Sequence, residues 1–232
     1  MLAKSAVLAV LFNIALAAPP ALLEARACPN VHVFGARETT VSAGFGSAGT
    51  VVNLILAAYS GATSEAIDYP AAGGTNAAYA ASVVAGVKAV TSQVTAYAQQ
   101  CPSTQIVLVG YSQVEQGAQI IDDAMCGGGD TNQGITDTST PISTSVASLV
   151  KAMIWMGNPR NIPGASYSVG TATADGFDPR TSGFSCSYAS MIQSYCDATD
   201  PYCSDGTDTA THQGYGSEYG QAALTFVKSK LS

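Results

Sequence analysis

The chain has 232 residues, with 9 Lys or Arg against 16 Asp or Glu, and a formal net charge of −7 at pH 7. This acidic balance leaves no basic stripe to neutralise phosphates, so we expect no nucleic-acid partner. Hydrophobic residues make up 47% of the chain and charged residues only 11%. This composition indicates a compact domain and excludes a disordered chain.

The first 18 residues have the pattern of a secretory signal peptide. Lys4 precedes an apolar stretch that ends in a small-residue cleavage signal, and this stretch is too short to span a membrane. Residues 19–26 fit a short pro-segment. We therefore expect a secreted, extracellular protein in which residues 27–232 form one domain with its own core.

Strand and helix patterns alternate along this domain. Runs of apolar, β-branched residues predict strands at Val31–Ala36, Glu65–Tyr69, Ile106–Gly110, Ala152–Met156 and Ala189–Tyr195. Apolar residues at helical spacing predict helices at Val51–Tyr59, Ala77–Gln100 and Gly220–Leu231. The alternation predicts an α/β fold, a central parallel sheet with helices on both faces. The Gly-, Thr- and Ser-rich segment 127–148 is interpreted as a solvated loop without a role.

The strand that begins at Ile106 leads directly to a candidate nucleophile. Its sequence, I-V-L-V-G-Y-S-Q, is apolar as far as Gly110 and places Ser112 two residues later. This is the pattern of a nucleophile elbow, in which a sharp turn from strand to helix presents the serine hydroxyl above the sheet. Gly-x-Ser alone is weak evidence, because glycine and serine are common in turns.

Such a serine requires a histidine as general base, and the chain contains only two. His32 alternates with apolar residues inside the first predicted strand and is interpreted as structural. His212 lies in a polar stretch just before a helical pattern and is the candidate base. Carboxylates precede it at Asp197, Asp200, Asp205 and Asp208. The order Ser, Asp, His is the one that α/β-hydrolases use, and the pattern does not choose among the carboxylates.

Six cysteines in a secreted chain favour three disulfides over a metal site. Fifteen pairings are formally possible. Cys196 and Cys203 bracket a short segment upstream of His212 and are suited to close a small ring. The spacing lacks the Cys-x-x-Cys pattern of zinc ligands, so no metal is expected.

Five separated blocks of the chain match one known pattern. They are C-P-N-V-H-V-F-G-A-R-E-T-T from Cys28, C-P-S-T-Q-I-V-L-V-G-Y-S-Q from Cys101, C-G-G-G-D from Cys126, S-Y-C-D-A-T-D-P-Y-C from Ser194 and H-Q-G-Y-G-S-E-Y-G from His212. Through them the chain resembles the cutinase-like family of serine esterases (carbohydrate esterase family 5 type), and within it the acetylxylan esterase branch. The last block separates this branch from cutinases proper. The resemblance implies a small, lidless α/β-hydrolase.

Carried over position by position, the resemblance implies a catalytic triad. Ser112 would be the nucleophile, His212 the base and Asp200, rather than Asp197, the acid. No cofactor is implied, because the mechanism is acyl transfer through an acyl-enzyme.

The resemblance also implies the surroundings of the triad. Thr39 and the backbone N–H of Gln113 would form the oxyanion hole. Tyr202 and Tyr215, which flank the acid and the base, are candidate substrate-binding walls, with ordinary packing as the alternative. The implied disulfides are Cys28–Cys101, Cys126–Cys186 and Cys196–Cys203.

The chain departs from the family string G-Y-S-Q-G by three residues, Val114–Gln116, that precede Gly117. Three residues add about 300° of rotation and ~4.5 Å of rise to a helix. We expect the insertion to bulge outward locally and weaken catalysis, because the helix behind it must keep Ile120, Ile121 and Ala124 buried. The alternative is that the natural protein lacks these three residues, and that a splice acceptor assigned to the wrong position in the gene adds their codons to the sequence. Asn158 stands where the family commonly has Asp, in M-G-D-P, and the sequence offers no physical reason.

The leading hypothesis is a secreted serine esterase that hydrolyses acetyl esters on xylan, and its expected partner is acetylated xylan or another small acyl ester. A cutinase or short-chain lipase-like esterase is the alternative that an open, apolar site would favour. A catalytically impaired binding protein is the alternative that the Val114–Gln116 insertion would favour. We expect a monomer in each case.

Overall fold

The structure is a computed structural model that describes residues 28–74, 76–111 and 116–232. The predicted signal peptide and pro-segment lie outside the described residues. So do Ser112, Gln113 and the first two residues of the predicted insertion, Val114 and Glu115.

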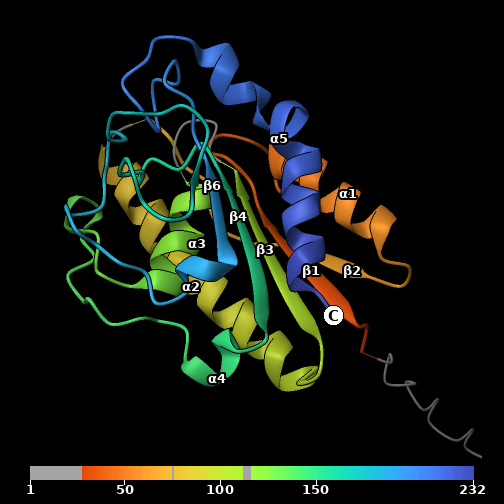
Figure 1. The fold of residues 1–232 in the computed structure, drawn as a ribbon. Coiled ribbons are helices and arrows are strands. Elements are labelled where there is room, and N and C mark those ends of the chain that lie inside the picture. Colours follow the sequence, from red (N-terminus) through yellow and green to blue (C-terminus); the bar gives the residue numbers. More distant parts are fainter. Residues whose placement is uncertain (1–27, 75, 112–115) are drawn as a thin grey trace, which may run out of the picture.

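A parallel sheet of six strands forms the centre of the described part of the chain, in the order β2-β1-β3-β4-β6-β5 (Figure 1). The strands are β1 (Val31–Ala36), β2 (Thr63–Ala66), β3 (Gln105–Tyr111), β4 (Val150–Met156), β5 (Ser168–Val169) and β6 (Ile192–Tyr195). Residues of β1, β3 and β4 are almost all buried, as expected for strands covered on both faces. Because every pairing is parallel, the carboxyl ends of β1, β3, β4 and β6 meet at one edge.

Helices cover both faces of this sheet (Figure 1). On one face lie α1 (Gly49–Ala58) and α5 (Thr209–Lys230), and on the other lie α2 (Asn76–Gln100) and α3 (Gly117–Cys126). Strand residues alternate between the two cores: Leu108 packs with the α2 and α3 side, and its neighbours Val107 and Val109 pack with the α1 and α5 side. The predicted α/β fold is confirmed. In the described ranges, no helix combines the length and the apolar character that crossing a membrane requires.

Several element boundaries differ from the prediction. Helix α5 begins at Thr209 rather than Gly220, so His212 lies inside its first turn. Its N-terminal turns carry glycines and polar residues that weaken the helical pattern. Asp208 caps the helix by accepting a hydrogen bond from the Ala210 N–H at 2.9 Å. The strand predicted to start at Ala189 starts at Ile192, after a 3-10 turn (η3, Ala189–Met191).

The segment 127–148 is not structureless. It contains the 3-10 turn η2 (Thr131–Gln133) and the short helix α4 (Thr144–Ala147). A further 3-10 turn, η1 (Gly46–Ala48), directly precedes α1. The two-residue strand β5 is not predicted from the sequence. The disulfides are Cys28–Cys101, Cys126–Cys186 and Cys196–Cys203, the pairs that the family resemblance implies.

Candidate active site

His212 and Asp200 form a buried pair at the edge of the sheet where the strands end. Asp200 lies in the loop between β6 and α5, inside the ring closed by the Cys196–Cys203 disulfide. His212 Nδ1 lies 2.6 Å from Asp200 Oδ2, and both side chains are fully buried. A carboxylate only accepts hydrogen bonds, so Nδ1 carries the proton. This tautomer leaves Nε2 as the basic nitrogen.

Four donors surround the Asp200 carboxylate. Oδ1 accepts from the backbone N–H groups of Tyr202, at 2.7 Å, and Cys203, at 3.1 Å. Oδ2 accepts from His212 and from the Tyr215 hydroxyl, at 2.8 Å. Burial acts to raise the pKa of Asp200, but these hydrogen bonds and the attraction of His212 outweigh it and hold the pKa below its usual value. The ionised form of Asp200 is therefore favoured.

The His212 ring is closely packed by its neighbours. Gly157, at the end of β4, has φ +66°, and a Cβ there would lie 2.4 Å from His212 Cε1. Only glycine satisfies both the backbone and the space at this position. The half-buried Tyr202 ring packs edge to face on the imidazole, with centroids 4.6 Å apart. His212 Nε2 has no hydrogen-bond partner among the described residues, so it is free to accept a proton.

Asp197 has a different environment from Asp200. Its Oδ1 accepts from the Thr171 N–H and hydroxyl, each at 2.9 Å, and both of its oxygens accept from the Tyr219 hydroxyl. It makes no hydrogen bond to His212. Asp197 therefore fixes the loop beside β6.

Of the two alternatives for Tyr215, a substrate-binding wall or ordinary packing, the structure supports packing. Its ring is fully buried, and its hydroxyl bridges the Asp197 N–H and Asp200 Oδ2, each at 2.8 Å. The sequence pattern starts this helix at Gly220 and so does not show that Tyr215 lies on a helix with His212. On a helix, a residue three positions later shares the face of His212 and points with it toward the sheet.

The approach of α3 to the sheet depends on Gly117. A Cβ at this position would lie 2.3 Å from the Ala36 carbonyl oxygen and 2.4 Å from that of Tyr111. The helix therefore opens where β1 and β3 end, as an elbow requires. Ile120, Ile121 and Ala124 are fully buried, which confirms the expected inner face of this helix.

Gln116, the residue before Gly117, is buried and anchored by its side chain. Its Oε1 accepts from the Ser82 hydroxyl at 2.6 Å, and its Nε2 donates to the Ala72 carbonyl oxygen at 2.8 Å. The prediction that the bulge includes Gln116 is therefore wrong. Removing residues 113–115 leaves the same Ser-Gln-Gly string as removing 114–116. The anchoring of Gln116 favours 113–115 as the three extra residues.

Thr39, the predicted oxyanion residue on the β1 side, is 1% exposed. Its hydroxyl has no hydrogen-bond partner among the described residues, which is unusual for a buried polar group. Thr39 follows the end of β1 and packs against Gly73, whose added Cβ would lie 2.9 Å from the threonine methyl. An unpaired hydroxyl thus lies at the carboxyl edge of the sheet.

A cavity of about 570 Å³ lies beside this edge. Its lining is mostly polar: Gly73, Gly74, Asn76, Tyr79, Asn132, Gln133, Phe177 and Asp178. On one side, Gly73 contacts Thr39. On the other, the Phe177 N–H donates to the carbonyl oxygen of Tyr202, the residue that packs on His212. The segment 127–148, predicted to have no role, supplies Asn132 and Gln133.

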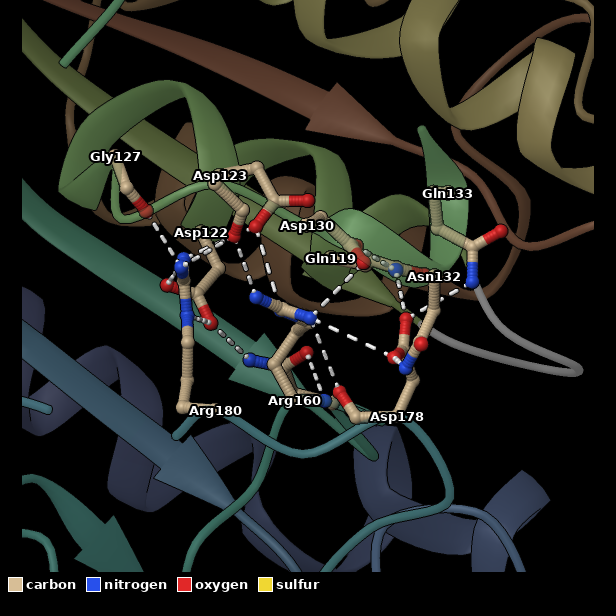
Figure 2. Close-up of polar contacts among 12 residues, drawn as sticks. Gln119, Asp122, Asp123, Gly127, Asp130, Asn132, Gln133, Arg160, Asp178 and Arg180 are labelled. Carbon is tan, nitrogen blue, oxygen red and sulfur yellow. Dashed lines mark hydrogen bonds and ion pairs between the residues drawn. The ribbon is translucent and has the colours of Figure 1, made fainter. Parts of the chain in front are cut away.

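A buried network of charges (Figure 2) includes Asp178, which also lines this cavity. Two guanidinium groups, Arg160 and Arg180, lie among four carboxylates, Asp122, Asp123, Asp130 and Asp178. Because the carboxylates are paired with arginines, they are not free to bind a cation. Within the described ranges, no group of three or more His, Cys, Asp or Glu side chains is arranged as a metal site.

This network explains Asn158. Its Nδ2 donates to Asp122 Oδ2 at 2.9 Å, and its Oδ1 accepts from the Arg160 N–H at 3.1 Å. An aspartate at position 158 would place a second carboxylate against Asp122. The amide avoids this repulsion in a network that already has more carboxylates than guanidinium groups.

The excess of carboxylates predicts a pH-dependent effect of Asp123→Asn. Burial raises the pKa of Asp123 well above 3.8, despite the attraction of Arg180 and Arg160. When the pKa of a carboxyl group is higher in the folded state than in the unfolded state, the folded state loses stability as pH rises above the unfolded-state pKa. Below that pKa the group is protonated in both states and has no such effect. We expect the asparagine variant to raise Tm by about 2–4 °C at pH 7, with the gain vanishing below about pH 4. Thermal unfolding across this pH range measures it.

Asp122→Asn is the matched control, because Asp122 pairs with Arg180 at 2.6 Å and its loss leaves that guanidinium short of a partner. This variant should lower Tm at pH 7. A lower Tm for Asp123→Asn as well would contradict a pKa of Asp123 that burial raises.

Comparison with known proteins gives close matches. The cutinase family model matches residues 27–231. Acetylxylan esterase 2 of Talaromyces purpureogenus is 58% identical over 214 residues, covering 90% of each chain. Cutinase 11 of Verticillium dahliae is 57% identical over 222 residues, covering 94% of this chain and 74% of that protein. The solved catalytic core domain of acetyl xylan esterase from Trichoderma reesei is 57% identical, with a TM-score of 0.85, covering 88% of this chain and 100% of that one.

Proposed function

The chain belongs to the cutinase family, and we propose that it is a secreted serine esterase that hydrolyses acetyl esters on xylan. The observation that carries the proposal is the buried Asp200–His212 pair. Tyr202, which packs on His212, accepts a hydrogen bond from the N–H of Phe177 in the wall of a mostly polar cavity. Relatives named acetylxylan esterase and cutinase are almost equally identical to this chain, so identity does not choose between the substrates. The polar lining favours an acetylated sugar over an apolar cutin ester.

In the proposed mechanism, Ser112 attacks the ester carbonyl while His212 Nε2 takes its proton. His212 returns that proton to the departing sugar alcohol, and the acetyl group remains on the serine oxygen. Water, deprotonated by the same nitrogen, then attacks the acyl-enzyme and releases acetate. Asp200 holds the imidazole in the required tautomer and stabilises the imidazolium that forms.

The oxyanion that forms on the carbonyl oxygen needs donors. We assign these to Thr39, whose buried hydroxyl is unpaired, and to the backbone N–H of Gln116 in place of Gln113. The reason is that Gln116 directly precedes α3, where the positive end of the helix favours developing negative charge. Tyr202 remains a proposed wall of the site, because its ring contacts His212.

For the whole chain, we propose residues 1–18 as a signal peptide, 19–26 as a pro-segment and 27–232 as a single, monomeric catalytic domain. The three disulfides support an oxidising, extracellular location.

Acyl chain length tests the proposed substrate class. We expect kcat/KM on p-nitrophenyl acetate to exceed that on the butyrate and longer esters, because the Tyr202 ring packs on His212 and would crowd a longer acyl chain. The esters share one leaving group, so the comparison isolates the acyl side. Faster hydrolysis of butyrate and longer esters would favour a cutinase or short-chain lipase.

Deleting the three extra residues tests whether they impair the elbow. The variant that lacks the three extra residues, 113–115, has the same sequence as one that lacks 114–116, because both read Ser-Gln-Gly. It should show a higher kcat on p-nitrophenyl acetate, by up to about 10²- to 10³-fold, because it joins Ser112 directly to Gln116, the proposed oxyanion donor. Equal kcat/KM for the two forms would show that the insertion does not disturb catalysis. Transcripts that lack these nine nucleotides would show that the natural protein has the shorter elbow.

The alternative of a binding protein without catalysis is less well supported, because the Asp200–His212 pair is intact.

A further inference from the structure

One wall of the cavity takes no part in the proposed acyl transfer. It consists of Phe177, Asn132 and Gln133, and we call it the amide wall. Phe177 is 45% exposed and is the one large apolar side chain with such exposure in the described ranges. The Tyr79 ring contacts it edge to face, with centroids 6.4 Å apart. An aromatic surface is therefore held in place at the rim of a polar cavity.

Hydrogen bonds to Asp178 orient both amides of this wall. Asn132 Nδ2 donates to Asp178 Oδ1 at 2.6 Å, and Gln133 Nε2 donates to Asp178 Oδ2 at 3.0 Å. A carboxylate only accepts, so the amide nitrogens must face Asp178 and the amide oxygens face elsewhere. Figure 2 shows the carbonyl oxygen of Gln133 directed away from Asp178. No described residue donates to either amide oxygen, so the wall offers hydrogen-bond acceptors.

The buried network fixes the carboxylate on which this orientation depends. Asp178 is 1% exposed, and it also accepts from Gln119 Nε2 at 2.9 Å. The Arg160 guanidinium lies 3.6 Å from its Oδ1 and donates to its backbone carbonyl oxygen at 3.3 Å. The acceptors are therefore preorganised and do not have to be ordered when a ligand binds.

From this geometry we propose that the amide wall is a glycosyl subsite. A neutral sugar residue of the polysaccharide main chain packs against the Phe177 ring and donates its hydroxyl hydrogens to the amide oxygens of Asn132 and Gln133. A uronic acid or a phosphate is disfavoured as a ligand. Its negative charge would lie next to amide oxygens, which only accept hydrogen bonds, and close to the Asp178 carboxylate. The choice of xylan as the polysaccharide rests on the proposed function.

Binding of xylotetraose, which carries no ester, tests the subsite without reference to catalysis. Calorimetry on the full-length secreted protein should give at least a 5-fold weaker affinity for Phe177→Ala and for Asn132→Ala, and near-normal affinity for Phe177→Tyr. Phe226→Ala, near the C-terminal end of α5 and not among the residues that line the cavity, is the matched control and should bind normally. Absence of xylotetraose binding by the unaltered protein would overturn the proposal, as would equal affinity for all the variants.

Kinetics provide a second readout that separates this proposal from the proposed esterase activity. With acetylated xylotetraose, Phe177→Ala should raise KM at least 5-fold with little change in kcat. With p-nitrophenyl acetate, which lacks the sugar, kcat/KM should change less than 2-fold. Equal losses on both substrates would indicate that Phe177 is structural and would contradict the subsite. If the unaltered protein binds xylotetraose but hydrolyses neither acetylated xylotetraose nor p-nitrophenyl acetate, only the esterase proposal is contradicted.

Discussion

Ser112→Ala should lower kcat on p-nitrophenyl acetate by about 10⁶-fold, the loss expected when the nucleophile of a triad is removed. The proposed mechanism has no second route to an acyl-enzyme, because His212 Nδ1 is committed to Asp200 and only the basic Nε2 remains available. The variant should keep the three disulfides and a Tm close to that of the unaltered protein. Steady-state kinetics measure the change in kcat. Disulfide mapping and thermal unfolding check that the variant is folded.

A residual rate near that of the unaltered protein would remove Ser112 as the nucleophile. A large fall in Tm together with the lost activity would instead show that the variant had unfolded. Ser82→Ala controls for the loss of a serine hydroxyl outside the proposed triad: Ser82 donates to Gln116 Oε1 and accepts from the Ala72 N–H. Its effect on kcat should be far smaller.

Asp200→Ala should lower kcat by about 10⁴-fold, and Asp197→Ala should change it by less than about 3-fold. The two carboxylates lie in the same disulfide-closed loop, but only Asp200 reaches His212. Without Asp200, the Nδ1 proton is no longer fixed, and the imidazolium that forms during the reaction loses its counter-ion. Asp197→Ala should instead lower stability by about 1–3 kcal/mol, because it leaves the Thr171 and Tyr219 donors unpaired.

Kinetics and thermal unfolding on both variants test this ranking. A larger kinetic effect of Asp197→Ala than of Asp200→Ala would show that the acid has been assigned to the wrong carboxylate.

The alternation of patterns predicted the fold well, because buried parallel strands leave an apolar signal that needs no tertiary information. It failed at the start of α5, where glycines and polar residues hide a helix held by packing of His212 and Tyr215 against the sheet. Because of that boundary, the sequence left both alternatives for Tyr215 open. The error at Gln116 arose because the string Ser-Gln-Val-Glu-Gln-Gly does not say which glutamine precedes the helix.

The candidate site was accessible from the sequence only in part. The order Ser, Asp, His was visible, but the choice of Asp200 over Asp197 needed the family resemblance, and its physical reason lies in contacts with Thr171 and Tyr219. The amide wall was not predicted. Its residues come from two loops brought together by Asp178 and the arginine network, and no local spacing links them.

The most direct test of the proposed mechanism is labelling of the unaltered protein with a fluorophosphonate probe, followed by peptide mass spectrometry. The probe forms a stable bond only with an activated nucleophile. We expect one adduct, on Ser112, formed at least about 10³-fold more slowly in His212→Ala, which lacks the general base. An adduct on any other residue, or none in a protein that still cleaves p-nitrophenyl acetate, would contradict the assignment of Ser112, His212 and Asp200.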